Sequence, residues 1–482
     1  MLFNSVDFAI FLPVVFLLYW FVANKSYKTQ NGLIVLASYF FYSCWDWRFS
    51  GLILVSTLVD FVVGLSLKDQ NNSFKRKLLL ALSIGANLGM LGFFKYYNFF
   101  IENFTQVFSL FGKDLGVQTL NIILPVGISF YTFQTMSYTI DVYRRQIEPT
   151  KDFIAFASFV AFFPQMVAGP IERAQNFLPQ FLKKRQFDYN KAVDGLRQVV
   201  WGIFKKTVIA DNCGIFVDGI FNNHASHNAS ALFIGAFLFT VQIYCDFSGY
   251  SDVAIGTSRL FGFDLKKNFN FPYFSRNIRE FWRRWHISLT TWFKDYVYIP
   301  MGGSRGSKLL QVRNTILIFL IIGFWHGAQW KFVVYGFINA LHFLPGIILG
   351  KAKRYQYNVA HNQCLPSLNE LFCILRTFLF LVVVRVFFRA DNLSQAISYL
   401  SGMFSVSLFK FPDLENIKQI LVLFILIGAS TIVEWLGRNN EYAIEKIPLK
   451  MKRLPRWAFY YGMVFMIFYF AGKQQQFIYF QF

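Results

Sequence analysis

Two histidines lie in surroundings where an imidazole can do chemistry. His326 ends the apolar run Ile316-Leu-Ile-Phe-Leu-Ile-Ile-Gly-Phe-Trp-His326. His286 lies in the aromatic and basic block Glu280-Phe-Trp-Arg-Arg-Trp-His286. A neutral imidazole can take a proton from a hydroxyl near neutral pH, and burial keeps it neutral. An ionisable group inside a membrane is costly unless it lines a polar path, so these positions indicate function.

Acyl transfer from a thioester to a hydroxyl is one reaction that His326 could serve. It requires a base, a path that excludes water and a dipole for the developing oxyanion. The structural alternative is a histidine that packs between helices and bonds a backbone carbonyl.

His286 also has two interpretations. It could simply lie in an interfacial helix, or it could be a second polar group at the cytoplasmic mouth of a path. In the second case, the neighbouring Arg283 and Arg284 would suit the phosphates of a nucleotide thioester donor.

The segment Tyr244-Cys-Asp246-Phe-Ser248-Gly-Tyr-Ser-Asp252 places two carboxylates near the end of an apolar stretch. Asp246 and Asp252 could cap a helix or pair with the basic block. They could instead line an acceptor pocket together with Ser248.

Several catalytic patterns are absent from the sequence. There is no GxSxG, Walker A, GxGxxG or HExxH motif. The HxxxxD pattern of glycerolipid acyltransferases is also missing, because Thr291 follows His286 by five residues and Lys331 follows His326 by five. The five cysteines form no CxxC pair, so neither a disulfide framework nor a metal site is expected.

The composition is that of a polytopic membrane protein. Of 482 residues, 55% are hydrophobic and 20% aromatic, which leaves too few polar residues to cover a soluble domain. The net charge of +21 is interpreted as the positive-inside bias of membrane proteins rather than as nucleic-acid binding.

Apolar stretches near the length of a bilayer span recur along the chain. The candidate spans are 6–23, 31–48, 51–67, 78–100, 119–140, 201–221, 229–247, 370–389, 417–436 and 456–472. The first is expected to be an uncleaved span. The segment 153–170 is expected to be re-entrant, because Pro164 and Gly169-Pro170 interrupt it. With the N-terminus outside, most lysines and arginines fall in cytoplasmic loops, and the 264–313 segment lies along the cytoplasmic interface.

The region from Asn314 to Leu349 allows two short crossings, or a hairpin that turns within the membrane at Gly327-Ala-Gln-Trp330. His326 lies 12 residues beyond Asn314, about 18 Å along a helix. In a hydrocarbon core about 30 Å thick, this depth is near the middle.

The order of several blocks resembles the membrane-bound O-acyltransferase (MBOAT) family, in particular its bacterial alginate O-acetyltransferase branch, which includes peptidoglycan O-acetyltransferase membrane components. The matching blocks are Leu124–Tyr131, Ile140–Arg144, Phe163–Pro170, Asp246–Asp252, Phe281–Ser288, Tyr298–Gly303, Gly323–Gly327, Arg385–Ala390 and Phe477–Phe482. The resemblance covers nearly the whole chain.

This resemblance implies an all-α membrane fold of about 10–12 transmembrane helices, with re-entrant and interfacial helices around a central funnel or tunnel. It implies that the histidine of the Trp-His-Gly motif, His326, is catalytic. His286, the histidine of the Arg-Trp-His motif, is expected as the second catalytic residue, which would position the donor or acceptor or relay a proton. Trp325, Trp285, Arg284, Arg283, Asp246, Ser248 and Asp252 are the expected substrate-binding residues. A single domain is expected over 1–482, with N-terminal helices at 1–118, a catalytic core at 119–350 and C-terminal helices at 370–482.

The expected activity is O-acetyl transfer at the bacterial inner membrane. The donor would be acetyl-CoA, and no cofactor would be tightly bound. The acceptor would be an alginate-like exopolysaccharide or peptidoglycan, reached directly or through a periplasmic acetyltransferase partner. The alternatives are a transporter or flippase and a scaffold that recruits a secreted acetyltransferase, although no paired broken helices favour transport.

Overall fold

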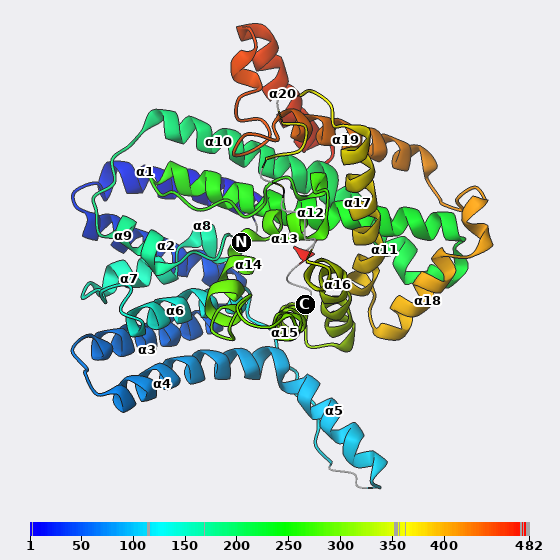
Figure 1. Cartoon of the computed structure of the whole chain (residues 1–482). Helices are drawn as coiled ribbons and strands as arrows, with labels where there is room; N and C mark the ends of the chain where they lie inside the picture. Colours follow the sequence, from blue (N-terminus) through cyan, green and yellow to red (C-terminus); the bar gives the residue numbers. More distant parts are fainter. Residues whose placement is uncertain are drawn as a thin grey trace. The chain divides into compact units, whose positions relative to one another are not determined.

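The computed structural model describes residues 1, 3–112, 116–167, 169–350, 355, 357–361, 363–472, 475, 477 and 478. Every regular element in this part of the chain is a helix (Figure 1), as the sequence predicts. The chain divides into two compact units, Met1–Gly195 with Ala254–Lys266 and Leu196–Val253 with Lys267–Phe482. Two of the three boundaries between the units fall within helices α10 and α12, and the third lies between Lys266 and Lys267, in the loop after α12.

The first unit contains the N-terminal helices. They are α1 (Val6–Leu17), α2 (Tyr27–Asp46), α3 (Ser50–Lys68), α4 (Ser73–Leu91), α5 (Tyr97–Leu110), α6 (Ile128–Tyr143), α7 (Phe153–Val160), α8 (Phe163–Met166) and α9 (Ala174–Phe181).

A buried carboxylate joins three of these helices. Asp60 of α3 accepts hydrogen bonds from Ser83 Oγ and from Asn87 Nδ2 (2.8 Å), both on α4, and from Thr139 Oγ1 on α6 (3.0 Å). All four side chains are fully buried. Because a buried polar group must find partners within the protein, this cluster holds the three helices in one register.

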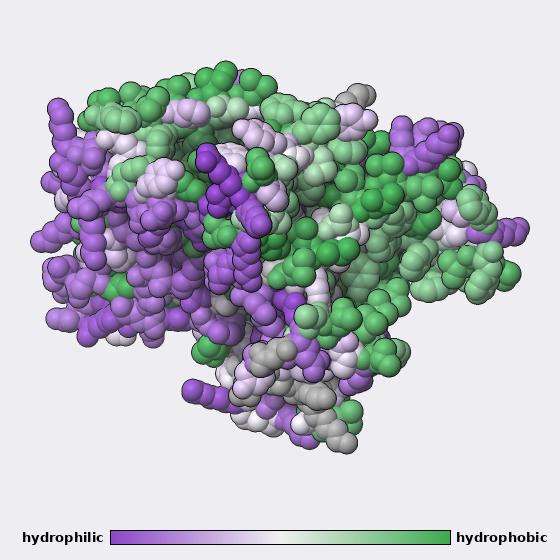
Figure 2. All heavy atoms as spheres, turned by 90° about the horizontal axis from the view of Figure 1, so that it is seen from above, coloured by the Kyte–Doolittle hydropathy of each residue, from purple (hydrophilic) through white to green (hydrophobic). Residues whose placement is uncertain are grey.

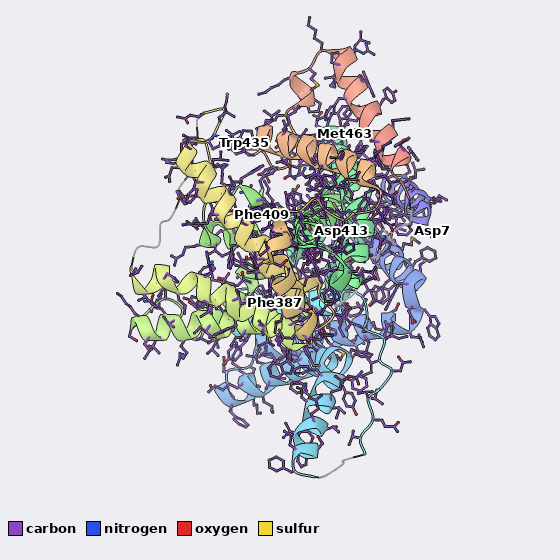
Figure 3. All side chains as sticks on the ribbon, turned by 90° about the vertical axis from the view of Figure 1, so that its right-hand side faces the viewer. Asp7, Phe387, Phe409, Asp413, Trp435 and Met463 are labelled. Atoms are coloured by element: carbon purple, nitrogen blue, oxygen red, sulfur yellow. The ribbon has the colours of Figure 1, made fainter. Side chains whose placement is uncertain are left out.

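The second unit contains the segments that carry both histidines. Helices α10 (Tyr189–Phe204) and α12 (Ala229–Leu260) contribute to both units, and α11 (Asp211–Asn222) lies between them in the chain. The remaining helices are α13 (Ile278–Arg284), α14 (Ile287–Phe293), α15 (Lys308–His326), α16 (Trp330–Ile348), α17 (Leu368–Arg389), α18 (Leu393–Met403), α19 (Ile417–Leu436) and α20 (Arg453–Tyr469). Asp413 lies in the loop before α19 and is labelled in Figure 3. Its carboxylate accepts a hydrogen bond from the backbone N–H of Asn228 at 3.1 Å, which ties this loop to the start of α12.

Helices α15 and α16 form an antiparallel hairpin (Figure 1), with the turn at the expected residues after His326. Glycines allow the two backbones to touch. A Cβ atom at Gly323 would collide with the carbonyl oxygen of Phe332, and one at Gly336 would collide with the carbonyl oxygen of Phe319. The close approach fixes the position of His326, which is the last residue of α15.

Seven helical stretches in the described residues are long and apolar enough to cross a membrane. Two of them, Tyr27–Lys68 and Ser73–Leu110, each contain two successive helices, and Val6–Val22 and Phe153–Met166 are shorter apolar helices. Hydrophobic side chains form broad areas of the surface beside a separate hydrophilic area (Figure 2). These features fit a multi-pass membrane protein. The exact number of crossings and the re-entrant path of 153–170 stay predictions.

The structure shifts several expected helix bounds. The span expected at 119–140 begins as a helix only at Ile128, because Pro125 precedes it and Gly127 has a positive φ of 74°. The span expected at 201–221 is interrupted by a π-helical turn at Lys205–Ala210. Since α15 already begins at Lys308, His326 lies a full helix length from its start, and its depth in the membrane stays a prediction.

Substituting Gly336 with Ala should destabilise the α15–α16 hairpin. The added methyl group meets backbone rather than a movable side chain, so the helices must separate, at a cost of about 1–3 kcal/mol. The thermal unfolding midpoint of the purified protein in detergent should fall. The matched control is Gly462→Ala on α20, where no atom lies within 4 Å of the added carbon. Equal midpoints for G336A and G462A would contradict this account of the hairpin.

Candidate active site

His326 is held among aromatic rings from three helices. Its side chain lies at the end of α15, and the residue is only 4% exposed. The imidazole centroid is 5.0 Å from the ring of Trp325, 5.2 Å from Phe388 on α17 and 6.3 Å from Tyr335 on α16. The predicted catalytic histidine therefore lies in an enclosed, largely apolar environment.

His286 occupies a constrained position between α13 and α14. Its backbone is left-handed, with φ of 43°, which is uncommon for a residue other than glycine. Its Nδ1 lies 3.2 Å from Oδ1 of Asn268, and that same oxygen accepts a hydrogen bond from Ser288 Oγ at 2.9 Å. The residue is fully buried. Asn268 thus fixes the orientation of the ring.

Trp325 brings the two histidines together. Its ring lies 6.2 Å from that of His286 and 5.0 Å from that of His326. Phe247 of α12 packs edge-on against His286 on another side, at 4.7 Å. The structure therefore places two residues that are 40 positions apart in the chain in one cluster.

Burial keeps His286 neutral. It lowers the pKa of this imidazole from 6.5 to about 3. A neutral ring can donate one hydrogen bond and accept another, whereas an imidazolium can only donate. His286 is consequently suited to hydrogen bonding within the site at neutral pH.

Trp285 lies beside a buried cation that the sequence analysis did not identify. The guanidinium of Arg385, on α17, lies 4.4 Å from the Trp285 ring and is 1% exposed. It donates hydrogen bonds to the hydroxyl of Tyr273 and to the carbonyl oxygen of Thr240. Its Nη2 has no hydrogen-bond partner among the described residues. Aromatic faces and neutral oxygens surround this charge in place of carboxylates.

The two neighbouring arginines have different environments. Arg284 is buried, and its Nη2 lies 2.8 Å from Glu280 Oε1 and 3.0 Å from Asn358 Oδ1. Arg283 is exposed. The two arginines therefore differ in burial, and Arg284 already forms an ion pair with Glu280. Their roles toward a donor stay predictions.

Asp246, Ser248 and Asp252 contact adjacent lysines rather than the basic block. Lys206 Nζ lies 2.8 Å from Asp246 and 2.8 Å from Asp211, and Lys205 Nζ lies 2.7 Å from Asp252 and 2.8 Å from Ser248 Oγ. Both aspartates form ion pairs, but with residues of the π-helical turn after α10, so the expected pairing with the basic block is wrong. A role of these side chains in an acceptor pocket stays a prediction.

Close helix packing makes these ion pairs possible. A Cβ atom on Gly249 of α12 would lie 2.7 Å from the carbonyl oxygen of Gly202 on α10. Because neither glycine carries a side chain, the two backbones approach and the lysines reach the carboxylates of α12.

The same network anchors the C-terminal segment. The backbone N–H of Ile478 donates to Asp246 Oδ2 at 2.8 Å, and the carbonyl oxygen of Gln475 accepts from Lys206 Nζ at 3.1 Å. The ring of Phe477 lies 4.4 Å from Tyr250 and 5.7 Å from Phe247. Of the C-terminal block noted in the sequence, residues 479–482 lie outside the described residues.

Some residues of the site that were not predicted could have been recognised in the sequence. Lys205 and Lys206 are two consecutive charges inside an apolar stretch, and Arg385 interrupts another, so each marked a costly burial. Asn268 carried no such signal, because only the fold brings it to His286. Within the described part of the chain, no three His, Cys, Asp or Glu side chains gather as metal ligands would.

Comparison with known proteins is consistent with this arrangement. The model of the membrane-bound O-acyltransferase family, MBOAT, matches residues 142–357, which include both histidines. The probable alginate O-acetylase AlgI of Azotobacter vinelandii is 38% identical over 91% of this chain and 85% of its own length. The chain belongs to the membrane-bound O-acyltransferase family.

Two further relatives support the assignment. The peptidoglycan O-acetyltransferase of Helicobacter pylori is 34% identical over 100% of this chain and 98% of its own length. The probable alginate O-acetylase AlgI of Pseudomonas aeruginosa is 39% identical over 86% of this chain and 76% of its own length. This MBOAT protein is therefore an O-acyltransferase, as the sequence predicts.

Replacing His286 with Gln should change how stability depends on pH. The unfolded imidazole has a pKa near 6.5 and the folded one near 3, so between these values only the unfolded chain takes up the proton. This contribution to stability is complete above about pH 6.5 and is lost as the pH falls toward 3. The fall in unfolding midpoint between about pH 7.5 and pH 5 should therefore be smaller in H286Q than in the wild type. The same fall in both proteins would show that His286 is not held neutral by burial.

Replacing Lys206 with Met should destabilise the second unit strongly. The change leaves two buried carboxylates without their cation, at a cost of about 3–5 kcal/mol in the free energy of unfolding. Lys191→Met is the matched control, because Lys191 pairs with Asp264 at 3.0 Å while both side chains are well exposed. That change should cost less than about 1 kcal/mol. Similar losses in denaturant titrations of the two variants would refute the importance of the network.

Proposed function

We propose that this MBOAT protein is an O-acetyltransferase in which His326 is the general base. The supporting observation is the placement of His326: it is 4% exposed, ringed by Trp325, Tyr335 and Phe388, and joined through Trp325 to a second buried histidine. An enclosed base can remove a proton from a hydroxyl while water, which would hydrolyse a thioester, is kept away.

The reaction follows from this assignment. His326 takes the proton of the acceptor hydroxyl, and the oxygen attacks the carbonyl carbon of the acetyl thioester. Negative charge develops on the carbonyl oxygen, then the carbon–sulfur bond breaks and the thiolate leaves. The proton held by His326 passes to the thiolate, which yields an ester and a free thiol. Arg385 provides a positive charge in the neighbouring aromatic cluster, and such a field favours the oxyanion.

His286 is assigned a positioning role. Asn268 fixes its Nδ1 side, and its ring packs toward Trp325, which contacts His326. Trp285, Arg283 and Arg284 are assigned to the donor side. Asp246, Ser248 and Asp252 hold α12 and the C-terminal segment beside His286, and through that arrangement they shape the acceptor side.

The substrates are assigned by likeness to the relatives. The donor is acetyl-CoA, which arrives from the cytoplasm. The acceptor is a hydroxyl of an alginate-like polysaccharide or of peptidoglycan, reached directly or through an extracytoplasmic acetyltransferase partner. The protein lies in the bacterial cytoplasmic membrane with its N-terminus outside. Family membership favours this enzyme over the transporter and scaffold alternatives.

Replacing His326 with Ala should reduce acetyl transfer by at least about 10²–10⁴-fold, because the proton-accepting group is removed. The measurement uses purified protein in lipid nanodiscs, acetyl-CoA labelled on the acetyl group, and alginate, peptidoglycan fragments or a serine-containing partner as separate acceptors. The acceptor that takes up label identifies the substrate.

The matched control is His361→Ala, which removes an exposed histidine stacked on Tyr357. Both variants should elute as the wild type does on size exclusion. Full transfer by H326A would refute the role of His326, and absence of transfer by the wild type with all three acceptors would refute the proposed reaction.

A further inference from the structure

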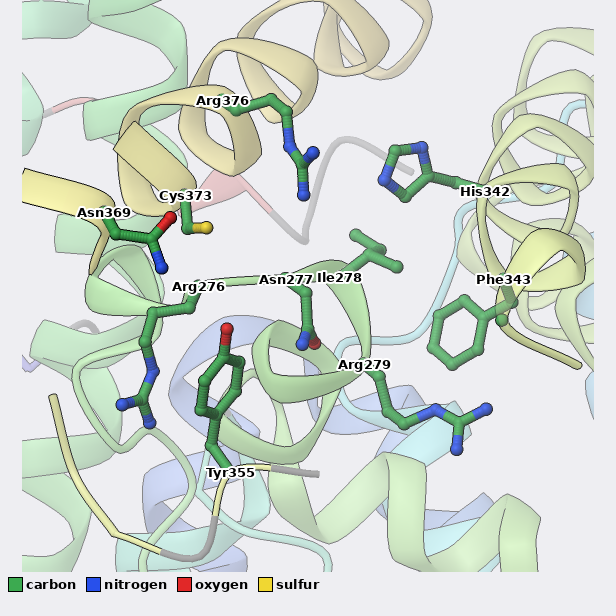
Figure 4. A pocket seen from close by; sticks show the side chains of 11 residues that line it. Arg276, Asn277, Ile278, Arg279, His342, Phe343, Tyr355, Asn369, Cys373 and Arg376 are labelled. Carbon is green, nitrogen blue, oxygen red and sulfur yellow. The ribbon is translucent and has the colours of Figure 1, made fainter. Parts of the chain in front are cut away.

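A cavity of about 380 Å³ lies in the second unit, between residues of α13, α16 and α17 (Figure 4). It is lined by Arg276 and Asn277, which precede α13, by Arg279 in the first turn of α13, by His342 from α16, and by Cys373 and Arg376 from α17. None of the residues assigned above to acyl transfer lines it. The cavity is therefore a separate feature of the molecule.

The lining is positively charged. Three arginines and no carboxylate are among its lining residues. Arg276 is neutralised by Glu280 at 2.9 Å and by Glu370 at 2.8 Å. Arg376 is exposed and forms no ion pair with any described residue. An anion that entered the cavity would meet the charge of Arg376 and the amide donor of Asn369, and Arg279 adds a further positive charge to the lining.

The cavity opens beside apolar surfaces. On α17, Phe372 and Leu379 lie one turn before and one turn after Arg376 on the same helix face, and they are 64% and 48% exposed. On α16, Leu341 next to His342 is 44% exposed. The ring of His342 stacks on Phe380 of α17 at 4.0 Å, so the two helices contact each other at the cavity. A ligand here would touch cations and hydrocarbon-compatible surface together.

The cavity lies toward one end of each helix, the C-terminal part of α16 and the N-terminal part of α17. Both α16 and α17 are long and apolar enough to cross a membrane. Arg376 is six residues after Glu370, the acidic residue in the first turn of α17, which is about 9 Å along the helix. An arginine at that position reaches the headgroup layer with its guanidinium while its stem stays in the hydrocarbon.

We propose that this cavity binds the phosphate of an anionic phospholipid, whose acyl chains lie along α16 and α17. Basic pockets between transmembrane helices suit such headgroups, because the phosphate gains charge-assisted hydrogen bonds and the chains stay in the bilayer. A soluble phosphate compound could meet the same arginine from the aqueous side, and the test below separates the two ligands. The proposal is independent of the acyl-transfer reaction.

Cys373 reports on occupancy, because it is a free, half-buried thiol in the lining. The test measures its rate of alkylation by a neutral maleimide, by peptide mass spectrometry, in nanodiscs of phosphatidylcholine with and without phosphatidylglycerol. Phosphatidylglycerol should slow the reaction at Cys373 by about threefold or more, the value of 1 + [L]/Kd at twice the Kd. Cys364 is the internal control, because it is free, exposed and outside the cavity.

Substitutions then test the assigned charge. R376Q should abolish the protection and R376K should keep most of it. R453Q, which removes an exposed arginine at the start of α20, should leave it unchanged. Equal rates in the two nanodiscs, equal slowing at Cys364, or protection that persists in R376Q would overturn the proposal. Protection of Cys373 by coenzyme A or inorganic phosphate in phosphatidylcholine nanodiscs would also overturn it, since the cavity would then belong to a soluble ligand.

Discussion

The packing of the second unit depends on buried ion pairs between α12 and the π-helical turn after α10. Two consecutive lysines, Lys205 and Lys206, reach the carboxylates of Asp252 and Asp246 on α12 at 2.7 and 2.8 Å. A buried ion pair is a poor source of stability, because desolvation offsets most of the attraction. These ion pairs instead specify how the helices pack. Any other register of the helices would leave charges buried and unpaired, so only one arrangement is accessible.

This constraint extends to the candidate active site through direct contacts. Asp246 holds the backbone of Ile478, and the preceding Phe477 packs on Phe247. Phe247 in turn packs edge-on against His286, which faces Trp325. A side chain that does not touch either histidine can therefore influence both of them. The left-handed backbone of His286 fits this interpretation, since a strained conformation persists only where the surroundings fix it.

Much of this architecture could be predicted from the sequence, because membrane-spanning helices and buried ionisable groups leave strong signals. The hydropathy predicts the helical class, and the turn after His326 lies where Gly327 indicates it. Side-chain pairing could not be predicted in the same way. Arg284 has a carboxylate four residues away at Glu280, yet Asp246 has its cation 40 positions away at Lys206. Such pairing depends on helix register, which local sequence does not determine.

The same unit treats its charges in two opposite ways. Lys205 and Lys206 face carboxylates, which cancel their field. The guanidinium carbon of Arg385 lies 4.4, 5.0 and 5.6 Å from the ring centroids of Trp285, Tyr273 and Phe281. Among the described residues, no carboxylate forms an ion pair with it. A cation held by aromatic faces keeps its field, since ring quadrupoles attract it without neutralising it. Acyl transfer develops negative charge where none existed before, so an uncancelled field next to Trp285, the residue before His286, favours that state over the bound reactants.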